Sequence, residues 1–407
     1  MPVRQESISF ALAALIVAIF SWPAAAQKKY DTGASNHEIR IGNTNPYSGP
    51  ASSYGMIGRT IDAFFKKLNA EGGINGRKIT FISYDDGYLP ARTLEQTRRL
   101  VESDEVLLVF QTLGTAQNVA IRRYLNNKKV PQLFVSAGAT QFGDPKNFPW
   151  TMGWHPNYQS EARIYAKYLL QNHPNGKIGV LYQNDDYGKD YLKGLKDGLS
   201  GKMPIVSEQS YETGDPTVFS QLISIRSAGA DVFFNVGTPK FAAQAIRRMA
   251  ETGWKPVHLL NNVSNSVGGV LKAAGLENAK GILSTQYTKD PTDPSWRDDP
   301  GYKEWLEFMD KYFPDGDKTS SFTVYGYSVA QTLVQVLKQC GDDLTRDNVM
   351  RQAANLRNLS LPMLVPGLLI NTGPTDYFPL EQLQMIRFSG ERWEKFGPLM
   401  AGELGRS

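Results

Sequence analysis

The chain of 407 residues has a single cysteine, Cys340, and only four histidines. One cysteine cannot form a disulfide within the chain, so packing and hydrogen bonds have to hold the fold. The histidines His37, His155, His173 and His258 are scattered and lack the spacing of metal ligands. We therefore predict no metal site and no cofactor, and we expect Cys340 to be a packed or partly exposed thiol.

Motifs of catalysis and nucleotide binding are also missing. The sequence has no Gly-x-Ser-x-Gly, no Walker A motif and no Gly-x-Gly-x-x-Gly after its first predicted strand. No Cys/His pair offers a nucleophile. The formal net charge of +4 is spread along the chain without a dense Lys/Arg block, which argues against nucleic acid as a partner. These absences predict a protein that is not an enzyme, and a secreted hydrolase is the alternative.

Long apolar runs are confined to the amino terminus. Arg4 precedes an apolar run at residues 8–20, and Pro23 and three alanines follow before Gln27. This order is typical of a secretory signal peptide, predicted over residues 1–26 with cleavage after Ala26. An uncleaved membrane anchor is the alternative, but the run is short for a spanning helix. We expect the mature protein in the periplasm.

Strand and helix patterns alternate from residue 39 onward. Short apolar runs predict strands, and apolar residues at helical spacing predict helices. Strands are expected at residues 39–44, 79–84, 106–111 and 132–135, and again at 178–182, 205–211, 231–236 and 257–260. Such alternation predicts an α/β fold with parallel sheets flanked by helices, arranged here as two Rossmann-like lobes. Beyond them we expect a strand at 281–285, helices at 301–312, 323–340 and 346–355, and β-hairpins over 367–396.

Several blocks of sequence resemble one family. They are Pro-Tyr-Ser-Gly-Pro at 46–50, Tyr54-Gly55, Asn-Ala-Glu-Gly-Gly-Ile-Asn-Gly at 69–76 and Tyr-Asp-Asp at 84–86. In this order and spacing they resemble the periplasmic leucine/isoleucine/valine-binding proteins, which are substrate-binding components of ABC transporters. The resemblance implies the type I periplasmic-binding-protein fold, with two lobes joined by a three-strand hinge and a ligand cleft between them.

The same resemblance implies how the chain divides and what it meets. Residues 37–152 plus 285–358 would form lobe 1, and residues 153–284 plus 359–400 would form lobe 2. The chain would cross between lobes near 151–154, 284–287 and 359–365. The expected partners are a small-molecule solute and the permease subunits of an ABC importer in the inner membrane, and transport is consistent with a monomer. The alternative is a ligand-sensing extracytoplasmic receptor component for amino acids or short amides.

The predicted ligand site lies in loops at the carboxyl ends of strands, where ligands of open α/β sheets gather. In the resembled family, loops equivalent to those at Thr115 and Thr140 hold the α-carboxylate of the ligand, although both threonines also suit helix N-caps. Tyr54, Trp154 and Tyr187 would form aromatic walls. The candidate residues are Tyr47, Ser48, Tyr54, Leu113, Gly114, Thr115, Ser136, Gly138, Ala139, Thr140, Trp154, Tyr187, Thr238, Asn262 and Val263.

The loop at Val263 departs from the resembled family. Amino-acid-binding relatives place a carboxylate in this loop to pair with the ligand's ammonium, but residues 261–265 contain no acid. A buried ammonium without a partner costs several kcal/mol, so we expect ordinary α-amino acids to bind poorly. Asp185 or Asp186 could replace the missing acid. We therefore expect an apolar or aromatic solute with a carboxylate head, with short amides and branched-chain amino acids as alternatives. The pair Asp85-Asp86 is interpreted as structural.

Overall fold

The computed structural model describes Met1 and residues 28–402. The predicted signal peptide therefore lies outside the described residues except for Met1, and it stays a prediction. In the described part, no helix combines the length and the apolar character needed to cross a bilayer.

The first sheet has five parallel strands in the order β3-β2-β4-β5-β6. The strands at residues 108–110 and 132–135 are buried throughout, which agrees with their short and mostly apolar sequences. Its strands are β2 (Glu38–Asn45), β3 (Lys78–Asp85), β4 (Leu108–Phe110), β5 (Gln132–Val135) and β6 (Thr151–Gly153). The helices between them are α1 (Gly55–Ala70), α2 (Pro90–Glu102) and α3 (Thr115–Lys128).

The second sheet has seven strands in the order β14-β13-β11-β10-β9-β7-β8. Five are parallel, and β13 and β14 add an antiparallel hairpin at one edge. Its strands are β7 (Ile178–Gln183), β8 (Ile205–Tyr211), β9 (Val232–Val236), β10 (Val257–Leu260), β11 (Leu283–Gln286), β13 (Gln382–Phe388) and β14 (Trp393–Ala401). Its helices are α4 (Tyr158–Asn172), α5 (Asp186–Leu199), α6 (Phe219–Ser227), α7 (Pro239–Glu251) and the short α8 (Lys272–Ala274).

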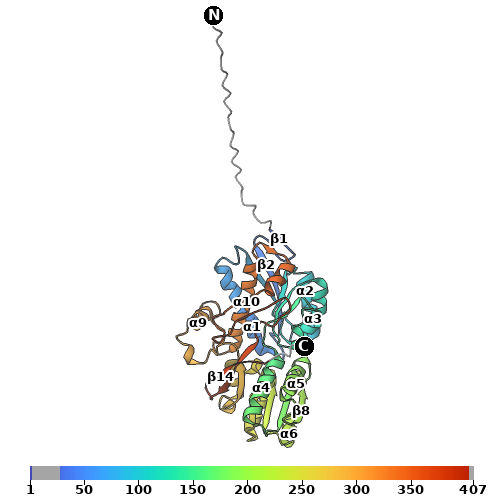
Figure 1. Ribbon diagram of the computed structural model, residues 1–407, viewed down its shortest axis with the longest axis vertical. Helices are drawn as coiled ribbons and strands as arrows, with labels where there is room; N and C mark the ends of the chain where they lie inside the picture. The colour runs from blue at the N-terminus through green and yellow to red at the C-terminus, as the bar shows by residue number, and fades with distance from the viewer. Residues whose placement is uncertain (2–27, 403–407) are drawn as a thin grey trace.

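Helices from late in the sequence complete the lobe of the first sheet. They are α9 (Pro300–Tyr312), α10 (Ser321–Cys340) and α11 (Arg346–Ala353). Phe64 of α1 packs edge-on against Tyr327 of α10 with ring centroids 5.3 Å apart, and against Phe308 of α9 at 6.0 Å. In Figure 1, α1, α2, α3 and α10 lie in the upper part of the molecule, and α4, α5 and α6 lie in the lower part. The predicted two-lobed α/β fold is confirmed, while the residue boundaries of the lobes stay predictions.

The crossing segments run beside each other between the lobes. The backbone N–H of Lys289 donates to the carbonyl of Met363 at 2.8 Å, and that of Val365 donates to Tyr287 at 2.9 Å. The chain after β11 is thus paired antiparallel with the chain that returns toward β13.

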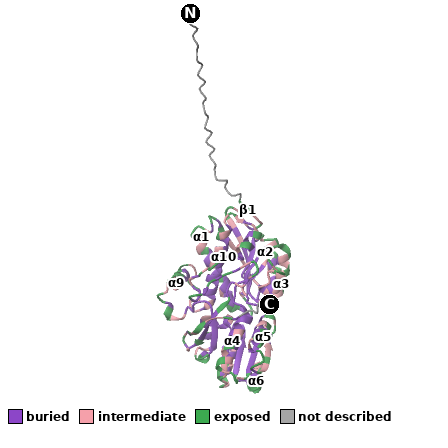
Figure 2. Cartoon of the chain, viewed as in Figure 1, coloured by how far each residue is buried: buried purple, intermediate pink, exposed green. Residues whose placement is uncertain are grey.

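Buried residues follow the strands of both sheets, and exposed residues gather on the outer helices (Figure 2).

Local details refine the predictions. Thr345 caps α11, because its hydroxyl accepts a hydrogen bond from the N–H of Asn348. The segment before β2 contains the two-residue strand β1 (Lys29–Tyr30), which pairs with β12 (Asp343–Leu344). The tail forms the hairpin of β13 and β14, with its turn at residues 389–392, but the segment before β13 holds only isolated bridges such as Gly373–Asp376. The prediction of hairpins over the whole of 367–396 was therefore too broad.

The acidic pair after β3 has structural partners. Asp85 accepts from the backbone N–H groups of Tyr47 and Ser48, and Asp86 accepts from the N–H of Tyr88 and the hydroxyl of Thr93. These bonds shape the turn that leads from β2 to α1 and the turn that leads from β3 to α2. The structural interpretation of the pair is confirmed.

Candidate ligand-binding site

A pocket lies between the two lobes, at the carboxyl ends of strands from both sheets. The space that its side chains enclose is about 860 Å³, including a part open to solvent. Its lining residues come from both lobes and from the segment after β11. They are Tyr54, Ile57, Tyr88, Leu113, Gly114, Thr115, Ser136, His155, Tyr158, Tyr187, Thr238, Asn262, Val263, Asn265, Val267, Thr285, Gln286, Tyr287, Thr288, Asp290, Ser321, Phe322, Tyr325 and Trp393.

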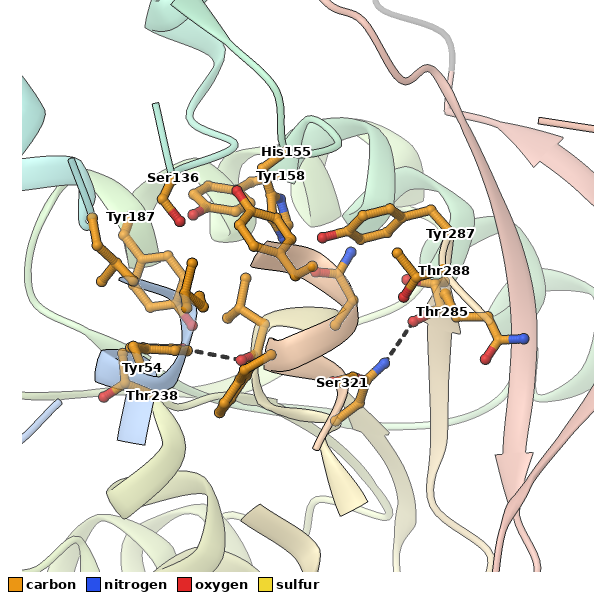
Figure 3. Close-up of a pocket in the computed structure, with 18 of the residues that line it drawn as sticks. Tyr54, Ser136, His155, Tyr158, Tyr187, Thr238, Thr285, Tyr287, Thr288 and Ser321 are labelled. Carbon is orange, nitrogen blue, oxygen red and sulfur yellow. Dashed lines mark hydrogen bonds between the residues drawn. The ribbon is translucent and has the colours of Figure 1, made fainter. Parts of the chain in front are cut away.

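One side of the pocket offers hydrogen-bond donors without charge. Gly114 has φ +103°, which lets the chain turn sharply into α3, and no side chain caps the first N–H groups of that helix. The buried hydroxyl of Thr115 makes no hydrogen bond of good geometry. Burial raises the pKa of the nearby Tyr158, and the Thr115 hydroxyl is close enough to offset a small part of that rise. A helix N-terminus with a free hydroxyl beside it is suited to a carboxylate. Ser136 is next to this turn, because the N–H of Gly114 donates to the carbonyl of Ser136 at 3.2 Å, and its side chain is at the pocket in Figure 3.

Aromatic side chains form most of the walls. Eight of the lining residues are Phe, Tyr or Trp, and they come from distant parts of the chain. Tyr158 packs edge-on against Tyr187 with centroids 5.3 Å apart, and Tyr54 packs against Phe322 at 5.1 Å. Figure 3 shows Tyr158, Tyr187, Tyr287 and Tyr54 around the same space. Such walls suit a flat or apolar ligand body.

The described lining residues bring no fixed positive charge to the pocket. No Lys or Arg is among them, and burial lowers the pKa of His155 to about 4. His155 is therefore neutral at neutral pH, with its Nδ1–H donating to the carbonyl of Pro156 at 3.0 Å. A ligand carboxylate in this pocket has to be held by neutral donors.

The loop that follows β10 reaches across the cleft. It forms the short helix η3 (Asn262–Ser264), and its Val263 carbonyl accepts a hydrogen bond from the Tyr54 hydroxyl of the other lobe at 3.0 Å (Figure 3). The side-chain amide of Asn262 is buried without a hydrogen bond of good geometry. It lies close enough to His155 to offset a small part of the lowering of the His155 pKa by burial. The loop brings no carboxylate to the pocket. The Asn262 amide carries no charge.

A carboxylate does lie beneath this loop. Glu161 of α4 is fully buried and accepts from the hydroxyls of Tyr165 and Tyr191 at 2.6 Å. It also accepts from the N–H of Asn262 at 2.8 Å and the hydroxyl of Thr285 at 3.0 Å. Burial raises its pKa to about 7, although all four donors lower it. Glu161 does not line the pocket, and its bonds position two residues that do.

Nine of the fifteen predicted site residues line the pocket together. They are Tyr54, Leu113, Gly114, Thr115, Ser136, Tyr187, Thr238, Asn262 and Val263. The structure places the other six outside the lining. They are Tyr47, Ser48, Gly138, Ala139, Thr140 and Trp154. Ligand contact itself stays a prediction for all fifteen.

The residues outside the lining have other partners. The N–H and the hydroxyl of Thr140 donate to Asp190 of α5 at 2.8 and 3.0 Å, so they join the two lobes. Trp154 lies behind the wall, where its ring contacts Tyr325 at 5.1 Å and its Nε1 donates to Thr332. A side chain at Gly138 would meet the carbonyl of Pro156, since a Cβ there would lie 2.1 Å from that oxygen. Ala139 is buried beside it.

The two acids considered as substitutes do not line the pocket. Asp185 caps α5 by accepting from the N–H groups of Tyr187 and Gly188, and Asp186 accepts from the amide of Gln141. The carboxylate that does line it is Asp290, in the segment after β11. Sequence reasoning did not find this residue, because nothing in the pattern after residue 286 shows that the chain folds back onto the cleft.

Other lining residues were missed for similar reasons. Tyr88 and Tyr287 follow the carboxyl ends of β3 and β11, and that position was an available signal. Phe322 and Tyr325 lie in the first turns of α10, and Trp393 begins β14. No local motif marks these three, which approach the cleft only through the tertiary fold.

Comparisons with known proteins agree with this architecture. The Brucella abortus (strain 2308) protein named Leu/Ile/Val-binding protein homolog 2 is 25% identical over 320 residues, covering 76% of this chain and 81% of that protein. A branched chain amino acid ABC transporter from Thermus thermophilus with bound valine matches the fold with TM-score 0.82 and 16% identity, covering 90% and 97% of the two chains.

A second solved structure, the fatty acid ABC transporter substrate-binding protein from Thermomonospora curvata, has TM-score 0.76 and 19% identity, covering 92% of this chain and 95% of that one. At these identities the structures support the fold alone. The family described as periplasmic binding protein matches residues 38–379, which is most of the chain. The chain therefore belongs to the periplasmic binding protein family.

Proposed function

We propose that this protein is the solute-binding component of an ABC importer and that its solute is an apolar or aromatic carboxylic acid. Proteins of this family bind solutes and are not enzymes. The observation that carries the proposal is the pocket itself: uncharged donors at one side, aromatic walls, and a loop after β10 without an acid. Closure of the two lobes around the solute would present it to the permease.

The donor side selects the head group. A carboxylate at Thr115 and the start of α3 receives hydrogen bonds from a hydroxyl and from backbone N–H groups. Each hydrogen bond to a charged group is worth about 1.5–3 kcal/mol. The solute's anionic charge would stand where water is excluded, so these bonds are needed for its binding.

The loop at Val263 selects against an α-ammonium. Its free polar group is the Asn262 amide, and the nearby carboxylate of Glu161 is already bonded to four donors. An α-amino acid would leave its ammonium facing a hydrogen-bonding group without charge. The second candidate is a branched-chain amino acid, which the names of the sequence relatives favour.

A thermal-shift screen of residues 27–407, refolded to remove carried-over ligand, tests the proposal. The panel pairs each amino acid with its deaminated analogue and adds benzoates and phenylpropanoids. A ligand at 100 times its dissociation constant adds about 2.7 kcal/mol of stability, a readily measured shift. Shifts by carboxylic acids without shifts by amino acids support the proposal. If leucine or valine stabilises the protein and the deaminated analogues do not, the second candidate is correct.

A further inference from the structure

The lining of the pocket contains one ionisable acid in the part of the chain that the structure describes. Asp290 is the only Asp, Glu, Lys or Arg among the described residues that line the pocket. Asp290 follows Thr288 by two residues in the segment after β11, and Thr288 lies on the opposite side of the cavity from Ser136 in Figure 3. The segment that carries Asp290 and the loop that carries Ser136 therefore reach the pocket from different sides.

The Asp290 carboxylate is buried, and its two oxygens differ in their hydrogen bonds. Its Oδ1 accepts from the N–H and the hydroxyl of Thr292, at 2.8 and 2.9 Å. Its Oδ2 is buried without a hydrogen bond of good geometry. A buried carboxylate oxygen without a donor is unfavourable, so a group that donates to it gains more than it would in water.

No neighbouring cation compensates this charge. Lys289 precedes it, but the Lys289 ammonium binds Asp299 at 2.6 Å and the carbonyl of Pro362 at 2.7 Å. In the part of the chain that the structure describes, Asp290 forms no ion pair, and Asp293 beside it is a second acid. Burial raises the pKa of Asp290 to about 6, and Asp293 raises it further, while the Thr292 groups and the nearby backbone N–H of Trp393 lower it. It is therefore mostly ionised at neutral pH and acts as an acceptor.

We propose that Asp290 is a specificity residue that binds a hydrogen-bond donor on the solute, at the end remote from the solute's carboxylate head. An ammonium is the donor that also neutralises the buried charge, and a hydroxyl is the weaker one. The solute would then be an aromatic or apolar carboxylic acid with a distal amine or hydroxyl. This inference rests on the proposed function, because it assumes that the pocket binds a small carboxylate.

Two series of probes test it by isothermal titration calorimetry. They are benzoates and 3-phenylpropanoates with a methyl, hydroxyl or aminomethyl group in the para position. In the wild-type protein, the aminomethyl compound of at least one series should bind about tenfold or more tightly than its methyl counterpart. The hydroxyl compound should lie between them. This comparison needs no variant.

Two variants locate the effect. Asp290→Asn should remove the advantage of the aminomethyl compound and leave the methyl compound within about threefold of its wild-type affinity. Asp298→Asn is the matched control. Asp298 lies in the same segment with its side chain fully exposed, and the substitution removes the same charge. It should change none of the affinities.

The outcomes separate this inference from the proposed function. If methyl compounds bind as well as aminomethyl compounds in both series, or if the advantage survives Asp290→Asn, the role of Asp290 is overturned while the solute class stands. If no carboxylate of either series binds the wild-type protein, the proposed solute class is overturned, and this inference with it.

Discussion

Tyr54 and Val263 are 209 positions apart in the sequence and are joined by a 3.0 Å hydrogen bond across the ligand cleft. The Tyr54 hydroxyl belongs to the lobe of the first sheet, and the Val263 carbonyl belongs to a loop of the second. The bond needs no ligand atom. It therefore links the two lobes independently of any interactions that a bound solute supplies.

Removal of this bond should weaken closure. Tyr54→Phe keeps the ring that packs on Phe322 and loses about 0.5–1.5 kcal/mol, which predicts an affinity about two- to tenfold lower. Small-angle scattering of the ligand-free protein should also show a more open average shape. Tyr47→Phe is the control, because the Tyr47 hydroxyl binds Ser83 outside the pocket. An unchanged ligand-free shape in Tyr54→Phe would contradict a role in closure.

Thr115 and Thr140 were predicted as equivalent contacts and should behave differently. Thr115→Val removes a free hydroxyl in the pocket, so carboxylate affinity should fall about tenfold with little change in stability. Thr140→Val removes one donor to Asp190 and should cost about 1.5–3 kcal/mol of stability. Denaturant unfolding and calorimetry of both variants make the comparison. Equal loss of affinity without loss of stability in Thr140→Val would restore the predicted ligand contact.

An acid at residue 263 should admit amino acids. Val263 lines the pocket in the loop where the resembled family carries its carboxylate. Val263→Asp should therefore raise affinity for leucine by about tenfold or more over wild type, since it pairs the ammonium with a charge. Val263→Asn is the control, because an asparagine side chain has nearly the same shape as an aspartate side chain but no charge. The test is calorimetry with leucine and 4-methylpentanoate, and a gain for Val263→Asn equal to that for Val263→Asp would refute the explanation.

The buried Glu161 should make stability depend on pH. Its pKa in the native state is about 7, above the ordinary value of 4.5, so the native state binds this proton more tightly than the unfolded state does. Its contribution is fully present below about pH 4.5 and is lost as the pH rises through 7. The stability difference between wild type and Glu161→Gln should fall by up to about 3 kcal/mol between pH 5 and pH 8. If the stability difference between wild type and Glu161→Gln is the same at pH 5 and pH 8, this prediction is wrong.

The lone thiol should be unreactive in the native protein. Cys340 is 5% exposed at the end of α10, and burial raises its pKa to about 12. The reactive thiolate is therefore scarce at neutral pH, and the reagent cannot reach the sulfur. Titration with a chromogenic disulfide should detect one thiol per chain in denaturant and almost none in buffer. Rapid native labelling would mean that the end of α10 opens locally.

Much of the secondary structure could be predicted from local patterns. Residues 257–260 were predicted as a strand and form β10, and residues 301–312 were predicted as a helix and form α9 (Pro300–Tyr312). A short apolar run indicates a strand that is buried on both faces, and apolar residues at helical spacing indicate a helix that is buried on one face. Every parallel sheet flanked by helices buries its strands and helices in this way. The site was partly accessible because loops at the carboxyl ends of strands had to meet.

The sequence by itself determined the two α/β lobes, the lack of an acid in the loop of Val263, and the likeness to a family of binding proteins. Only the tertiary structure decided which side chains face the cleft. Thr140 turns to Asp190, Trp154 lies behind the wall, and Asp290 reaches the pocket from a segment without a motif. The physical reason is that a local pattern encodes whether a residue is buried, whereas the neighbour it is buried against depends on how distant segments pack.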